Sequence, residues 1–181
     1  AHRGPNDSGL WLDESAGVAL GHRRLSILDL SPLGHQPMRS ASGRFTVAFN
    51  GEIYNYRALR SELEPFGHSF RGGSDTEVLL AAFEQWGPEA LTRFNGMFAI
   101  ALWDARARTL ALARDRMGKK PLYYGRAGSA VAFGSELKAL VANPDFSREL
   151  DRDALALYFR LGYIPCPHSV YTQARKLPPG H

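Results

Sequence analysis

The chain has 181 residues, of which 44% are hydrophobic and 22% charged, with one Cys and a formal net charge of +4. This length is typical of one domain with its own core, and a single Cys excludes a disulfide framework or a thiolate zinc cage. No apolar run reaches the roughly 20 residues that span a bilayer, and the polar first residues are unlike a secretion signal. We therefore expect a cytoplasmic protein that contacts no membrane.

Short runs rich in aromatic and β-branched residues predict six strands. These runs are Gly17–His22, Arg44–Phe49, Met97–Asp104, Thr109–Arg114, Pro121–Tyr124 and Ala130–Phe133. The polar stretches at residues 105–108 and 126–129 predict two hairpins. Hairpins interrupted by helices favour an α+β fold with antiparallel sheets, two in number, over a repeated parallel unit.

Helical periodicity marks two segments between the second and third of these strands. Apolar residues recur every three to four positions in Leu59–Phe66, and Val78–Trp86 carries a second apolar stripe. Before the second helix, Ser74 and Glu77 match a capping box, in which each side chain bonds the other residue's backbone amide. Asp75 then lies in the first turn of that helix.

The last third of the chain predicts two more helices, at residues 136–143 and, behind the candidate cap Asp151, up to Phe159. Residues 163–181 contain four prolines and predict an extended connector without a regular element. We therefore predict a domain at residues 1–143 and a Pro-rich connector at residues 144–181.

Several common site types are absent from the sequence. It has no Gly-rich dinucleotide turn, no Walker loop, no Gly-x-Ser-x-Gly elbow and no pair of His residues spaced for a zinc site. The Arg residues are scattered, and the densest basic group, Arg114–Lys120, contains Asp115, which favours a solvated or internally paired surface. We expect neither a metal nor a nucleic-acid partner.

The block Phe49–Tyr56 follows a predicted strand and suggests acyl-transfer chemistry. A Gly after Asn permits a backbone turn that exposes the Gly51 amide beside the Asn50 side-chain amide. Two neutral donors at this spacing suit a developing oxyanion. On these residues alone, the alternative is an ordinary strand-end turn in which Asn50 bonds its own backbone.

Several blocks occur in a fixed order along the chain. They are Ala1–Gly9, Leu20–Ile27, Asn50–Tyr56, Gly73–Glu77, Gly96–Ala99 and Arg114–Tyr124. In this order they resemble the glutaminase domain of glutamine-hydrolysing asparagine synthetases, over nearly all of residues 1–142. The resemblance implies the N-terminal-nucleophile hydrolase fold, an αββα sandwich of two antiparallel sheets, here without its first strand.

The same resemblance implies a reaction and its partners. L-glutamine would be hydrolysed to glutamate and ammonia without a cofactor in this domain. A C-terminal synthetase domain of the same chain, with ATP and magnesium, would use the ammonia to amidate aspartate to asparagine. The resemblance is also compatible with a homodimer. Two alternatives stay open: a related class II amidotransferase with another acceptor, and a glutamine-binding module without chemistry.

Site roles also come from the resemblance. Asn50 and Gly51 match the oxyanion donors, and Arg24 matches the residue that binds the glutamine α-carboxylate, which suits a guanidinium fork. Glu52 and Asp75 match the acceptors near the substrate α-amino group. The alternatives are a structural ion pair for Arg24 and helix-cap chemistry for Asp75.

Backbone groups at Leu25 and Ile27 are also implied in the glutamine pocket, with core packing as the alternative for their side chains. The family's nucleophile is an N-terminal Cys whose own α-amino group acts as base, whereas the chain begins with Ala1. Cys166 lies in the Pro-flanked tail and has no such amine. We therefore expect part of a longer protein, in which these 181 residues alone release no ammonia from glutamine.

Overall fold

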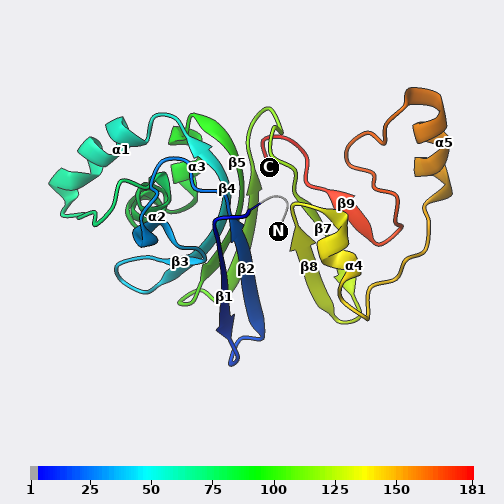
Figure 1. Cartoon of the computed structure of the whole chain (residues 1–181), viewed down its shortest axis with the longest axis horizontal. Helices are drawn as coiled ribbons and strands as arrows, with labels where there is room; N and C mark the ends of the chain where they lie inside the picture. The colour runs from blue at the N-terminus through cyan, green and yellow to red at the C-terminus, as the bar shows by residue number, and fades with distance from the viewer. Residues whose placement is uncertain (1–3) are drawn as a thin grey trace. The chain divides into compact units, whose positions relative to one another are not determined.

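A computed structural model describes residues 4–181 (Figure 1). The expectations that involve Ala1, His2 and Arg3 lie outside the described residues. The contacts divide the chain into two compact units, Ala1–Leu112 and Ala113–His181. The domain boundary at residue 143 stays a prediction.

The first six strands form two separate sheets. One is an antiparallel hairpin of β1 (Asp7–Asp13) and β2 (Val18–Arg24). The other has four strands in the order β3-β4-β5-β6. Its members are β3 (Met38–Arg39), β4 (Phe45–Ile53), β5 (Gly96–Asp104) and β6 (Thr109–Arg114). Adjacent β5 and β6 confirm the hairpin predicted at residues 105–108.

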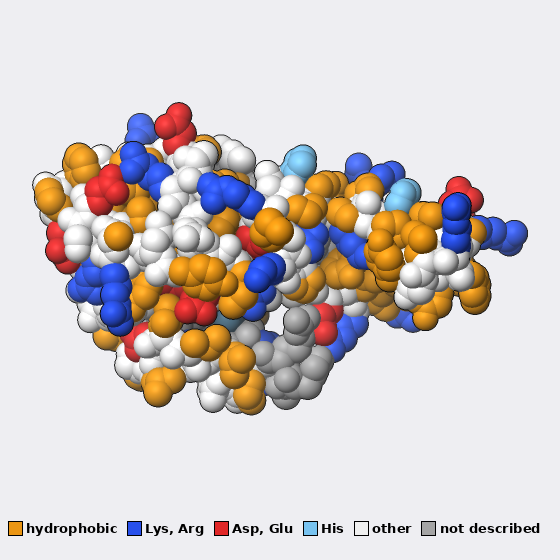
Figure 2. Space-filling model, turned by 90° about the horizontal axis from the view of Figure 1, so that it is seen from above, with side chains coloured by type: hydrophobic (Ala, Val, Ile, Leu, Met, Phe, Trp, Pro, Cys, Tyr) orange, Lys and Arg blue, Asp and Glu red, His pale blue; other side chains and the backbone are white. Residues whose placement is uncertain are grey.

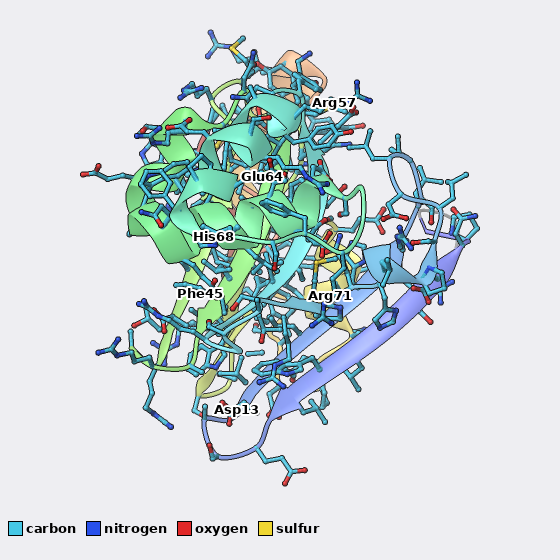
Figure 3. The ribbon with its side chains drawn as sticks, turned by 90° about the vertical axis from the view of Figure 1, so that its left-hand side faces the viewer. Asp13, Phe45, Arg57, Glu64, His68 and Arg71 are labelled. Atoms are coloured by element: carbon cyan, nitrogen blue, oxygen red, sulfur yellow. The ribbon has the colours of Figure 1, made fainter. Side chains whose placement is uncertain are left out.

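Helices α1 (Tyr56–Leu63) and α2 (Asp75–Trp86) confirm the two periodic segments and lie beside the four-stranded sheet (Figures 1 and 3). The same unit contains the short helices η1 (Pro32–Gly34), η2 (Glu64–Phe66), η3 (Gly87–Glu89) and α3 (Ala90–Arg93). A chain of aromatic contacts from Phe45 through Phe83 and Phe94 to Phe98, with centroids 6.0 to 6.3 Å apart, joins helices and sheet. These rings form the core beneath the helices.

The capping box at the start of α2 forms only in part. Ser74 is the N-cap, as predicted, but its side chain accepts from the Thr76 amide at 3.0 Å. The Glu77 carboxylate accepts from the Arg71 and Gly72 amides at 3.1 and 2.8 Å. The predicted bond between the Glu77 side chain and the Ser74 amide is therefore wrong, because the preceding loop offers Glu77 two other amides.

The second unit contains a three-stranded sheet in the order β8-β7-β9. Its elements are β7 (Tyr123–Ala127), β8 (Ala130–Gly134), α4 (Leu137–Val141), α5 (Arg152–Leu161) and β9 (Ala174–Lys176). The hairpin between β7 and β8 is confirmed, as is Asp151 as N-cap of α5. Phe146 and Leu140 anchor the core of this unit.

Strand β9 corrects the expectation that residues 163–181 lack a regular element. It pairs antiparallel with β7, from Tyr123↔Lys176 to Gly125↔Ala174. The prolines flank this segment and leave residues 174–176 free to donate amide hydrogen bonds.

The basic group predicted near Asp115 is tied to the backbone. Arg114 donates to the carbonyls of Gly118, Lys120 and Leu177 at 2.6 to 2.7 Å. Asp115 is 1% exposed and accepts from three amides of the same loop. Arg114 and Asp115 are therefore held by backbone groups instead of being solvated as expected. On the face seen in Figure 2, Lys and Arg side chains are scattered, with Asp and Glu among them.

The α+β class with antiparallel sheets is confirmed, although the described residues form three sheets instead of two. Strand β1 was not predicted from the sequence. Its residues Leu10, Trp11 and Leu12 form one apolar run without the alternation that is typical of a half-buried strand. Among residues 4–181, no helix is long and apolar enough to cross a membrane.

Candidate functional site

The outer edge of β4 is the centre of the candidate site. The Tyr54 amide donates to Asn95 O at 2.7 Å and the Ala105 amide to Arg44 O at 2.9 Å, which fixes the even-numbered residues of β4 as the hydrogen-bonded partners of β5. In an antiparallel ladder, the alternate residues turn both backbone groups the other way. The amides of Phe49, Gly51 and Ile53 therefore point away from β5.

Buried polar side chains cap this edge on both sides of Gly51. Gln36 Oε1 accepts from the Phe49 amide at 2.7 Å, and Asp75 Oδ2 accepts from the Ile53 amide at 2.9 Å. His22 Nε2 lies 3.0 Å from Phe49 O. Within the described part of the chain, no corresponding cap is found on the Gly51 amide, so a hydrogen-bond donor stays available between two occupied ones.

Asn50 and Gly51 lie inside β4, which continues to Ile53. The backbone turn predicted at Asn50 and Gly51 is therefore wrong. The alternative, an ordinary turn at the end of the strand, is wrong for the same reason. Gly51 is required for a different reason: a Cβ at this position would lie 2.7 Å from Phe98 Cα and closer still to Met97 O. The sequence thus indicated the right residues, but their geometry comes from strand packing.

Arg24 ends β2 and is only 8% exposed. Its Nη1 donates to Ser31 O at 2.9 Å and its Nη2 to Asp29 O. The ion-pair alternative is therefore wrong in detail, because the guanidinium binds neutral carbonyls of the loop that follows β2. Two of the five N–H donors of an arginine are used in this way.

Asp29 connects this loop with the segment that leads into α2. Its Oδ1 accepts from the Ser31 amide at 2.8 Å and its Oδ2 from the Gly73 amide at 3.0 Å. The Ser31 side chain, together with these two amides, holds the pKa of Asp29 below its ordinary value. Figure 3 places the labelled Arg71, at the start of this segment, between the helices and the β1–β2 hairpin.

Replacing Asp29 with Asn should release one of these two amides, because an amide side chain offers one oxygen and turns its NH₂ group towards the other donor. We expect a loss of about 1 kcal/mol in the free energy of unfolding and faster hydrogen exchange of the Gly73 amide. Asp13→Asn is the control, since Asp13 accepts from Ser15 and Ala16 in its own turn, away from this loop. Unchanged exchange at Gly73 in Asp29→Asn would contradict the connection.

Asp75 is the most perturbed carboxyl group of the site. It is 6% exposed at the first position of α2. Burial, with a smaller repulsion from Glu52, raises its pKa to about 6, against the opposing hydrogen bonds from the Ile53, Asp75 and Thr76 amides. Glu52 precedes Ile53 on β4, and the Ile53 amide donates to Asp75, so both acidic residues belong to the same end of this strand.

Leu25 and Ile27 do not pack in the core. The two residues are 56% and 57% exposed, so the core alternative is wrong for both. Sequence reasoning assigned no role to His22, Gln36 or Asp29. His22 lies in the same block as Arg24, but a single His and a Gln before Pro37 carry no signal of a contact with a distant strand.

Comparison with known proteins identifies relatives over the entire chain. Residues 1–181 match the family described as Glutamine amidotransferase domain. The chain is 40% identical over 182 residues to asparagine synthetase [glutamine-hydrolyzing] 3 of Bacillus subtilis (strain 168), covering 99% of this chain and 29% of the relative. It is 43% identical over 180 residues to asparagine synthetase [glutamine-hydrolyzing] 1 of the same strain, covering 99% and 28%.

A solved structure is also similar. Glutamine phosphoribosylpyrophosphate amidotransferase from B. subtilis, complexed with ADP and GMP, aligns with a TM-score of 0.58 and 29% identity, over 68% of this chain and 28% of that chain. The chain therefore spans less than a third of the length of each of these relatives.

Proposed function

We propose, from the premise that this chain belongs to the glutamine amidotransferase domain family and is homologous to the glutaminase regions of asparagine synthetases, that its β4 edge binds L-glutamine for hydrolysis. Ammonia would be the product passed on and glutamate the product released. One observation carries the proposal: the Gly51 amide, which has no partner among residues 4–181, lies between two capped amides on the strand edge that Asp75 also reaches.

Each part of glutamine has a matching group. The ammonium faces Asp75 and Glu52, whose carboxylates only accept hydrogen bonds when ionised. The α-carboxylate takes remaining N–H donors of Arg24, beside the two that hold the loop. The γ-carboxamide oxygen lies at the Gly51 amide and the Asn50 side chain, where two donors stabilise the oxyanion of a tetrahedral intermediate.

The chemistry then follows the general course of acyl transfer. A nucleophile adds to the γ-carbonyl carbon, the C–N bond breaks, ammonia leaves with the added proton, and water releases glutamate from the acyl intermediate. The family resemblance assigns the nucleophile to an N-terminal Cys. Cys166 is exposed in the second unit, whereas the glutamine-binding residues all belong to the first.

The remaining parts of the proposal concern the whole protein. Ammonia would amidate aspartate to asparagine in a synthetase domain of the kind named in the relatives, with ATP and magnesium bound there and the protein in the cytoplasm as a homodimer. Within residues 4–181, no group of three or more His, Cys, Asp or Glu side chains could hold a metal ion. The domain itself would use no cofactor.

The test is ammonia release from L-glutamine by the polypeptide as the cell makes it. In Arg24→Lys, a point charge replaces the planar fork, so we expect the KM for glutamine to rise about tenfold. Synthesis from free ammonia should continue at its normal rate. If both activities fall equally, Arg24 is structural and the proposed carboxylate contact is wrong.

A second acceptor class has support in the similarity to a phosphoribosylpyrophosphate amidotransferase. The glutamine half of the reaction would be the same, and only the ammonia acceptor would differ. Asparagine formation from aspartate, measured in the same preparation, separates the two.

A further inference from the structure

We propose that His22 and Gln36 are positioning residues that hold the carbonyl and the amide of Phe49 at the outer edge of β4 and thereby set the direction of the Gly51 amide. This proposal rests on the proposed function, because it concerns how the oxyanion donor is placed. It assigns a role to two residues that bind no part of glutamine themselves.

The His22 contact fixes the proton on one ring nitrogen. A carbonyl only accepts, so the Nε2 that lies 3.0 Å from Phe49 O must carry the hydrogen. Nδ1 is buried and has no hydrogen-bond partner among the described residues, which disfavours a second proton there. Burial lowers the pKa of His22, against the Phe49 hydrogen bond, which agrees with a neutral ring.

Gln36 holds the other backbone group of the same residue. It is 6% exposed, and its Oε1 accepts from the Phe49 amide at 2.7 Å. Its Nε2 lies 3.5 Å from Thr76 Oγ1, in the first turn of α2. Gln36 therefore connects the edge of β4 with the helix that begins at Asp75.

Together, these contacts bind three elements around one residue of β4. His22 lies two residues before Arg24 on β2, Gln36 reaches α2, and Phe49 lies two residues before Gly51 on the same edge. Strand β3 pairs only with Thr46 and Val47, so side chains replace a neighbouring strand along this part of β4. A shift of Phe49 would tilt Gly51 and move its amide away from the oxyanion.

The test uses paired variants of the polypeptide as the cell makes it. His22→Leu and Gln36→Met remove the contacts, while His22→Gln and Gln36→Glu keep a donor and an acceptor, respectively, at similar positions. The matched control is Ser40→Ala, since Ser40 Oγ accepts from the Phe45 amide at 3.2 Å, at the far end of the same strand. All five are assayed for glutamine hydrolysis below their melting temperatures.

We expect kcat to fall about tenfold in His22→Leu and Gln36→Met, with KM changed less than about threefold, because only the oxyanion donor moves. The conservative variants should recover most of the rate, and Ser40→Ala should keep it. A loss of kcat no greater than in Ser40→Ala, or a rise in KM alone, would overturn the proposal.

A measurement on the unmodified protein covers the case in which the variants fail to fold. Nitrogen NMR of the His22 ring should show the neutral Nε2–H tautomer at pH 7, whereas an Nδ1–H tautomer would overturn the donation to Phe49. If the unmodified protein releases no ammonia from glutamine, the proposed function fails. If it does and the variants match the control, only this inference fails.

Discussion

Asp75→Asn is expected to make the protein more stable at pH 7.5 and much poorer at using glutamine. Asn keeps an oxygen that can accept from the Ile53 amide, which Asp75 bonds at 2.9 Å. The substitution removes a carboxyl group whose pKa is raised from 3.8 to about 6, chiefly by burial. A shift of this size corresponds to roughly 1 to 3 kcal/mol after allowance for relaxation.

The sign of the pH dependence follows from the raised pKa. Burial of the protonated Asp75 stabilises the fold fully below pH 3.8, and this stability is lost as the pH rises through about 6. The Asn side chain of the variant does not titrate. The melting temperatures of the two proteins should therefore diverge between pH 4 and pH 6.5 and differ at pH 7.5 by roughly 2 to 4 °C for each kcal/mol.

Loss of function is the other half of the same prediction. In the proposed contact, the glutamine ammonium donates a charge-assisted hydrogen bond to Asp75, and such a bond contributes about 1.5 to 3 kcal/mol, so KM should rise by roughly 10- to 100-fold in Asp75→Asn. In the unmodified protein, kcat/KM should fall as the pH drops below about 6, because Asp75 becomes protonated. In the Asp75→Asn variant, kcat/KM should not show this decrease at acidic pH.

Asp151→Asn is the matched control. Asp151 caps α5 in the second unit through the Ala154 amide at 2.9 Å, and Asn caps equally well. Neither the melting temperature nor the KM should change. If Asp75→Asn destabilises the protein at pH 7.5 instead, then the carboxylate is favourable as an anion and its burial costs less than the raised pKa implies.

The sequence predicted most elements because their signals are local. Helix α2 has an apolar stripe and a Ser cap, and the turn at Gly128 joins two β-rich runs. The Glu77 contacts could not be predicted, since they depend on where the loop at residues 71–72 runs in space. Strand β9 was missed for a similar reason: three residues form a strand only because β7 lies beside them.

The candidate site shows the same limit. Asn50, Gly51, Glu52 and Asp75 were indicated by motif blocks, and the structure joins β4 and Asp75 through one hydrogen bond at Ile53. Gln36 lies 13 positions from Phe49 and His22 lies 27, so no short-range pattern contains either contact. The residues proposed to bind glutamine lie in sequence motifs, whereas the residues proposed to position them are recognisable only from tertiary contacts.

Gly51→Ala is expected to cost at least about 3 kcal/mol of the free energy of unfolding. The added Cβ would lie 2.7 Å from Phe98 Cα and 2.9 Å from Phe98 Cβ, with Met97 O closer still. These atoms belong largely to the backbone of β5, which has strands on both sides and cannot move cheaply. Urea unfolding of the two proteins measures the difference.

Gly21→Ala is the control that separates packing from backbone freedom. Gly21 lies in β2, would place an added Cβ with no heavy atom within 4 Å, and does not adopt a positive φ. Ala should therefore be neutral or stabilise the fold by up to about 1 kcal/mol, by restricting the unfolded chain. Equal effects at Gly21 and Gly51 would contradict the close approach of β4 and β5. The Gly51→Ala variant would keep the backbone amide of this residue. Lost activity would therefore report the spacing of these strands, on which the position of the proposed oxyanion donor depends.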